Sequence, residues 1–179
     1  GTVKSSRVLR FIVFGLVAFT LFVLQGVSLA FRDLNRVLHF TLYTDGHTLL
    51  GLYAFFSMVM FGALYYILPR LLLREWPSVR LITLHFWCCG LGVILYVVAF
   101  TVGGIQQGLA LNDAQIPFIN IVGSLVPYFE LGTLAWILLT LGHLALAVNF
   151  VKMICTPSPA GATAATLFRQ PPALEVAAR

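Results

Sequence analysis

The stretch that decides the fold is Thr41–Pro69, which reads TLYTDGHTLLGLYAFFSMVMFGALYYILP. It opens with a turn-like Thr-Asp-Gly and carries no charged residue after Asp45. An uncharged apolar run of more than twenty residues is long enough to cross the hydrocarbon core of a bilayer as a helix. We therefore predict a transmembrane helix here, with Asp45 capping its start. His47 would lie about one turn below one membrane surface, where a histidine is a candidate ligand or proton carrier.

The composition of the whole chain points to the same class of protein. Its 179 residues are 60% hydrophobic and only 9% charged, and the mean hydropathy is +0.96. These values exclude an ordinary soluble domain and indicate an integral membrane protein. The net charge of +5 does not indicate nucleic-acid binding, because the basic residues stand singly at the ends of apolar runs. In such places they fix topology and meet anionic lipid head groups.

Four apolar runs predict an all-α integral membrane protein, a bundle of four transmembrane helices. We expect these spans at about residues 8–31, 44–69, 81–105 and 127–151. With their connections they form a predicted bundle over residues 1–153, followed by a Pro/Ala-rich and flexible tail over residues 154–179. Polar residues interrupt Phe118–Val126, so we expect this piece to lie at the interface, separate from the fourth span.

The distribution of Lys and Arg predicts how the bundle is oriented. Cytoplasmic loops of membrane proteins carry an excess of these residues. The chain start, the loop between the second and third spans and the C-terminal side are basic, whereas the two remaining loops together carry only Arg32 and Arg36. We therefore expect both termini in the cytoplasm and His47 near the outer face.

The third span carries a histidine and two adjacent cysteines. His85 precedes Phe86 and Trp87, and we interpret it as an interfacial histidine beside an aromatic anchor. Cys88 and Cys89 are interpreted as core residues, because vicinal cysteines in lipid have no exposed thiolate. The sequence contains no CxxC and no Cys/His spacing typical of zinc, so we predict neither a disulfide framework nor a structural metal.

Three stretches, read in order, resemble one known family. They are Leu24–His47 (LQGVSLAFRDLNRVLHFTLYTDGH), Gly62–Leu71 (GALYYILPRL) and Leu84–Leu109 (LHFWCCGLGVILYVVAFTVGGIQQGL). The string is similar to the catalytic subunit of cbb3-type cytochrome c oxidases, the C-family of the haem–copper oxidases. The resemblance runs from about Arg7 to Lys152. It implies that this chain corresponds to the last four of that subunit's twelve helices. It also implies a place in a respiratory complex of a bacterial inner membrane.

The resemblance also implies that the ligand-bearing helix is degenerate. In the family, the helix matching the opening stretch carries a Gly-His-X-His motif. Its first histidine is the axial ligand of the high-spin haem, and its second ligates the low-spin haem. Here the motif reads Gly46-His47-Thr48-Leu49, so His47 keeps the first position and Leu49 cannot bind iron. Oxygen reduction needs a haem, a copper and a second haem, so we expect no catalytic residues and no oxygen reduction by this chain alone.

Three functions stay open at this point. The first is a non-catalytic subunit of a respiratory membrane complex, a scaffold or docking surface for other membrane subunits, cytochrome c-type subunits and lipid. The second is an electron-transfer subunit in which His47 binds the iron of a b-type haem. Arg32 and Arg36 would then contact the haem propionates, although pairing with Asp33 or lipid phosphates is favoured because arginine is common at any membrane interface. The third is one piece of a split cbb3-type oxidase.

Overall fold

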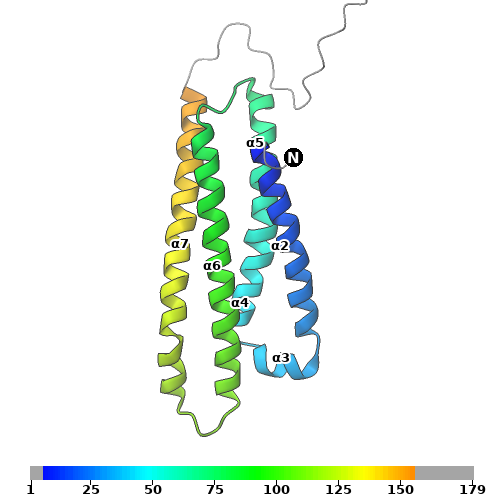
Figure 1. Ribbon diagram of the computed structural model, residues 1–179, viewed down its shortest axis with the longest axis vertical. Coiled ribbons are helices and arrows are strands. Elements are labelled where there is room, and N and C mark those ends of the chain that lie inside the picture. The colour runs from blue at the N-terminus through cyan, green and yellow to red at the C-terminus, as the bar shows by residue number, and fades with distance from the viewer. Residues whose placement is uncertain (1–5, 156–179) are drawn as a thin grey trace, which may run out of the picture.

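The computed structural model describes residues 6–155, which form four long helices lying side by side (Figure 1). The helical runs long and apolar enough to cross a membrane are Arg7–Leu29, Leu42–Leu72, Val79–Leu111 and Phe118–Cys155. All regular secondary structure within residues 6–155 is helical, so the predicted all-α bundle is confirmed. From residue 156 onward, the expected tail lies outside the described residues.

The first span is followed by a short helix that connects it to the second span. Helix α2, Arg7–Leu29, begins after Ser6, whose Oγ accepts a hydrogen bond from the backbone N–H of Leu9 at 3.3 Å. Helix α3, Arg32–Leu38, then crosses the lower end of the bundle in Figure 1. The connection is therefore helical, and Arg32 and Arg36, four residues apart on α3, share one face.

The second span starts earlier than expected. Its first segment, α4, covers Leu42–Leu49, and its cap is Thr41. The Oγ1 of Thr41 accepts a hydrogen bond from the N–H of Tyr43 at 3.3 Å. The prediction that Asp45 caps the helix is wrong, because the backbone is extended at Thr41 and Asp45 already lies in the first helical turn.

The middle of the second span is a π-helix. This segment, η1, covers Leu50–Ser57 and is followed by α5, Met58–Leu72. The side chain of Ser57 donates to the carbonyl of Leu52, five residues earlier, at 2.9 Å. The wider turn of a π segment changes the direction in which the following side chains point, and such segments are frequent at functional sites. Here it begins directly after Leu49.

Helices α6, Val79–Leu111, and α7, Phe118–Cys155, pack against each other as a long antiparallel pair (Figure 1). Where we expected a separate interfacial piece at Phe118–Val126, the structure has one uninterrupted helix. The hydroxyl of Ser124 donates to the carbonyl of Ile121 at 2.8 Å, so this polar group is satisfied within the helix. Pro127 removes a single backbone donor, and neighbouring turns carry the helix past it.

Polar contacts tie the ends of these helices together. Asn149 on α7 is fully buried, and its amide both accepts from the N–H of Ser78 at 3.0 Å and donates to the Ser78 carbonyl at 2.9 Å. Arg74, in the loop after α5, donates to the Met153 carbonyl at 2.9 Å and to that of Ile154. The cation therefore satisfies free carbonyl groups at the C-terminal end of α7, where a positive charge is favourable.

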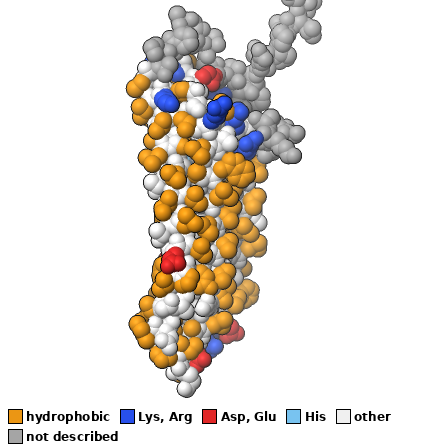
Figure 2. All heavy atoms as spheres, turned by 60° about the vertical axis from the view of Figure 1, so that its left-hand side comes forward, with side chains coloured by type: hydrophobic (Ala, Val, Ile, Leu, Met, Phe, Trp, Pro, Cys, Tyr) orange, Lys and Arg blue, Asp and Glu red, His pale blue; other side chains and the backbone are white. Residues whose placement is uncertain are grey.

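Basic residues gather at one end of the bundle. Of the eight Lys and Arg residues within 6–155, Arg32 and Arg36 lie on α3, and the other six lie at helix ends on the opposite side. Both ends of the described chain also lie toward that side (Figure 1). Figure 2 shows the basic groups at the upper end and hydrophobic side chains over the middle of the visible face. This pattern is typical of a bundle that crosses a membrane.

Two glycines let α6 approach its neighbours closely. A Cβ added at Gly104 would lie 2.0 Å from the backbone nitrogen of Tyr43, and one added at Gly108 would lie 2.0 Å from the carbonyl oxygen of Val37. Both contacts are with backbone atoms, which cannot rotate away as a side chain can. Gly104 therefore sets the distance between α6 and α4, which carries His47, and Gly108 sets the distance between α6 and α3.

We predict that Gly104→Ala destabilises the bundle by about 1–3 kcal/mol, the usual cost of overpacking a close contact. The measurement is thermal unfolding of the purified chain in detergent. The matched control is Gly123→Ala on α7, because a Cβ there meets nothing within 4 Å. Equal melting temperatures for the two variants would contradict the packing argument.

Candidate functional site

His47 lies on α4 and faces helix α2. Its ring stacks on the ring of Phe22, with centroids 4.5 Å apart and an interplanar angle of 9°. Gly26, one turn further along α2, gives the imidazole its room. A Cβ added at Gly26 would lie 3.3 Å from His47 Cε1 and 3.6 Å from Nε2. The side chain therefore packs flat against α2, as an aromatic ring does.

The two ring nitrogens of His47 decide whether the residue fits a haem. An axial histidine binds iron through one nitrogen and donates the other N–H to a carbonyl, carboxylate or water. Here Nδ1 is buried without a hydrogen-bond partner among the described residues. The edge that contains Nε2 lies against Gly26. Among the described residues, His47 therefore has no partner that would orient it as an axial ligand.

Leu49 lies on the other side of the helix from His47. Two residues along an α-helix correspond to a rotation of about 200°. Leu49 is half-buried and packs against a core that includes Phe11, Leu50 and Met58. A leucine at this place adds apolar packing and offers no ligand.

Arg32 and Arg36 are exposed on α3. Among residues 6–155, neither arginine forms a hydrogen bond or an ion pair, with Asp33 or with any other residue. The structure therefore does not bring the two arginines and His47 together in one site. Their exposure at one end of the bundle suits the interfacial interpretation.

A polar network surrounds the C-terminal end of α2. The side-chain N–H of Gln25 donates to the hydroxyl of Thr101 on α6 at 3.0 Å. The hydroxyls of Ser28 and Tyr43 are 3.0 Å apart and share a hydrogen bond. The Oε1 of Gln25 is buried and has no partner among the described residues. These bonds join α2 to α4 and α6 but supply no set of metal ligands.

The interpretation of His85 as an interfacial histidine is wrong. His85 has no exposed surface, and its Nδ1 lies 2.8 Å from the hydroxyl of Tyr65, while its Nε2 has no partner among the described residues. The sequence did contain the signal. Ile82, His85 and Cys89 recur at helical spacing on the buried side of α6, whereas Trp87 is 53% exposed.

A second group of polar side chains lies close to His85 and was not predicted. The hydroxyl of Tyr53 on η1 lies 3.2 Å from Cys89 Sγ and 3.1 Å from Nε2 of His143 on α7. The rings of His85 and His143 have centroids 6.1 Å apart. The π-helical segment places Tyr53 between α6 and α7, which no helical periodicity could show. Within residues 6–155, no three His, Cys, Asp or Glu side chains are arranged to hold a metal ion.

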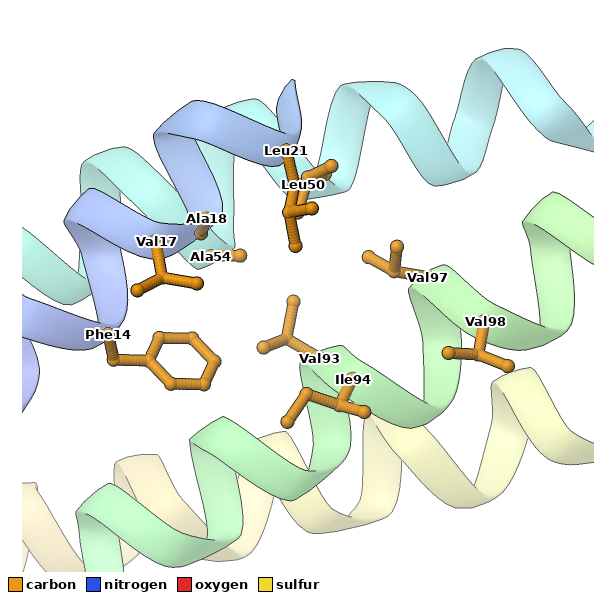
Figure 3. A pocket seen from close by; sticks show the side chains of 10 residues that line it. All are labelled: Phe14, Val17, Ala18, Leu21, Leu50, Ala54, Val93, Ile94, Val97 and Val98. Atoms are coloured by element: carbon orange, nitrogen blue, oxygen red, sulfur yellow. The ribbon is translucent and has the colours of Figure 1, made fainter. Parts of the chain in front are cut away.

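An apolar groove lies between α2, η1 and α6. Its volume is about 200 Å³, and Figure 3 shows its ten lining side chains, of which four come from α2, two from η1 and four from α6. None of these side chains carries a donor, an acceptor or a charge. The groove can accept an acyl chain or apolar side chains, and it offers nothing that would ligate a cofactor.

Comparison with known protein families gives a match over residues 2–138 to the family described as Cytochrome C and Quinol oxidase polypeptide I. The chain belongs to this family. This agrees with the resemblance found in the sequence, and the matched residues include the helix that carries His47. The bundle is an oxidase subunit I-like membrane protein, and a place in the respiratory chain is implied.

Curated relatives include cbb3-type proteins. The chain is 32% identical, over 88% of its length, to the cbb3-type cytochrome c oxidase subunit CcoN1 of Stutzerimonas stutzeri, and spans 35% of that protein. It is 29% identical, over 85% of its length, to a cytochrome c oxidase subunit 1 homolog of Agrobacterium tumefaciens, and spans 30% of it. The chain thus spans about a third of the length of these relatives. The predicted relation to cbb3-type oxidases is confirmed.

A solved structure shares the fold. It is the cryo-EM structure of a heme-copper terminal oxidase dimer, with a TM-score of 0.70 and 21% sequence identity. The match covers 89% of this chain and 28% of that one. The four helices are therefore arranged as in part of a haem–copper oxidase.

We predict that Tyr65→Phe destabilises the bundle by about 1–3 kcal/mol, because it leaves the buried imidazole of His85 without its hydrogen bond. Thermal unfolding in detergent measures the loss. Tyr66→Phe is the matched control, since the variant keeps the ring on which the Arg70 guanidinium lies 3.6 Å from the centroid. A Tyr65→Phe protein as stable as this control would contradict the prediction.

Proposed function

We propose that the chain is a non-catalytic, oxidase subunit I-like membrane subunit of a respiratory electron-transfer complex, in which its helices act as a scaffold or docking surface. The observation that carries this proposal is the sequence and packing of α4, the helix that matches the family's ligand-bearing helix. Only the first ligand position is a histidine, and the edge of the His47 ring that contains Nε2 lies against Gly26. Leu49, at the second position, is part of the packing instead.

Membership of a larger assembly is supported by polar groups at the surface and in the interior of the bundle. Glu130 is exposed on α7, within a span that lipid would otherwise surround. The Oε1 of Gln25 is buried without a partner among the described residues. Hydrocarbon cannot satisfy such groups, whereas a neighbouring helix can. We propose other membrane subunits as partners, cytochrome c-type subunits among them, with lipid over the remaining apolar surface.

The proposed location is the inner membrane of a bacterium, with both termini in the cytoplasm. Six of the eight described Lys and Arg residues lie at one end of the bundle, where α2 begins and α7 ends. The usual excess of basic residues on the cytoplasmic side supports an orientation with this end inside. His47, near the other end of the second span, would lie close to the outer face.

Two alternatives follow from the family. In the first, His47 carries a b-type haem in the assembled complex, which requires its ring to leave Phe22 and Gly26 and to turn toward a partner chain. In the second, this chain is one piece of a split cbb3-type oxidase, which requires a second chain that supplies the remaining helices. Leu49 weighs against the second alternative, because it leaves the low-spin haem without the ligand that this helix provides in the family.

We predict that His47→Ala leaves the Soret absorbance of the purified complex unchanged, per mole of complex. The reason is that the ring stacks on Phe22 and its edge with Nε2 lies against Gly26. His39→Ala, in the exposed residue that follows α3, is the matched control. Loss of Soret absorbance in His47→Ala alone would establish the haem-binding alternative and overturn this part of the proposal.

We also predict that an affinity-tagged chain, purified in a mild detergent, brings other respiratory membrane subunits with it. Mass spectrometry of the intact chains identifies these subunits. A second subunit I-like chain that supplies the remaining helices would support the split-oxidase alternative. Recovery of the chain alone, at every detergent concentration that keeps it folded, would contradict a role as a docking subunit.

A further inference from the structure

The group formed by Tyr53, Cys89 and His143 has no role in the function proposed above. It joins η1, α6 and α7, and each member contacts the next. Cys89 has no exposed surface and Tyr53 is half-buried, whereas His143 reaches the surface of the bundle. Ionisable side chains inside a membrane-spanning bundle are expensive to keep and usually mark a proton or ion site.

One nitrogen of His143 has a fixed role. Its Nδ1 lies 2.8 Å from the carbonyl oxygen of Leu139, one turn earlier on α7. A carbonyl oxygen can only accept, so Nδ1 must carry a hydrogen. In the neutral imidazole, Nε2 is therefore the acceptor, and in the imidazolium it becomes a donor.

The hydroxyl of Tyr53 has one hydrogen and two neighbours that can accept it. When His143 is neutral, this hydrogen lies in the bond to Nε2, 3.1 Å away. When Nε2 takes up a proton, it donates to the Tyr53 oxygen instead. The hydroxyl keeps its own hydrogen and turns it to Cys89 Sγ, 3.2 Å away. In the neutral state the S–H of Cys89 can donate to the Tyr53 oxygen instead, so each group keeps a partner in both states. The only atom gained is the proton on Nε2.

We propose that His143 is a proton-binding site within the membrane bundle, and that Tyr53 transmits its protonation state to Cys89. The reversal of one hydroxyl links the surface of α7 to the buried face of α6. No movement of a helix is needed, since both hydrogen bonds fit the same heavy-atom positions. The inference does not depend on whether the chain acts as a scaffold.

The other titratable groups around His143 lie on α6 and α5. From α6, His85 faces it at 6.1 Å between ring centroids, and Cys88 lies beside Cys89 against Gly142. From α5, the ring of Phe61, which is not titratable, contacts His143. Tyr65, also on α5, hydrogen-bonds to His85. No carboxylate and no Lys or Arg contacts His143 among the described residues. Two imidazolium ions at this separation would repel each other.

Infrared and NMR spectroscopy of the full chain in lipid nanodiscs test the proposal. With Cys88→Ser and Cys155→Ser in the background, the S–H stretch reports Cys89 alone. We expect this band to shift as the pH falls, over the same range in which the ¹⁵N resonances of His143 show protonation of Nε2. His143→Gln and Tyr53→Phe should each abolish the shift, and His39→Gln, in an exposed histidine outside the group, should leave it unchanged.

Two results would overturn the proposal. One is a His143 ¹⁵N spectrum that stays constant over the whole pH range in which the chain keeps its helical circular dichroism. The other is an S–H shift that persists in His143→Gln. Tyr53→Phe keeps the aromatic ring in place, so a folded variant remains available to test the relay if His143→Gln does not fold.

Discussion

The bundle depends on one constraint, which is that hydrocarbon offers no hydrogen bonds. Every polar group in a span must find its partner within the protein, and the helices are arranged so that nearly all do. Short hydroxyl side chains bond to carbonyls one turn earlier, as Thr48, Thr133 and Thr140 do. Longer side chains join helices, as Gln25 and Asn149 do. The few buried atoms left without a partner among the described residues belong to Gln25, His47 and His85.

The histidines inside the spans of this chain are of two kinds. His47 retains the position of a family ligand, yet it packs as an aromatic ring against α2, with one nitrogen unpaired. His85 and His143 occupy no family ligand position known from the sequence, yet both hydrogen-bond to tyrosines from the second span. The hydrogen-bonded histidines of this bundle therefore lie on α6 and α7.

Much of the fold could be predicted from the residues, and much less of the site. Apolar runs between basic ends defined the spans, because span length and charge placement are set by the membrane and not by tertiary contacts. The cap at Thr41 and the continuity of α7 were missed, since each depends on local backbone geometry that a polar residue only suggests. His85 was misassigned because its neighbours Phe86 and Trp87 suggested an interface. The helical phase of α6, which turns it inward, was the better guide.

The sequence by itself determined that this is a membrane protein of four helices, related to the oxidase subunit. Composition and motif order suffice for that, because each is a property of single residues or short runs. Only the tertiary structure decided what the histidines do. Whether an imidazole faces a glycine or a tyrosine depends on the rotation of its helix and on the π-helical turn at Leu50–Ser57. Those are fixed by close packing between helices far apart in the chain, such as that of Gly104 against Tyr43.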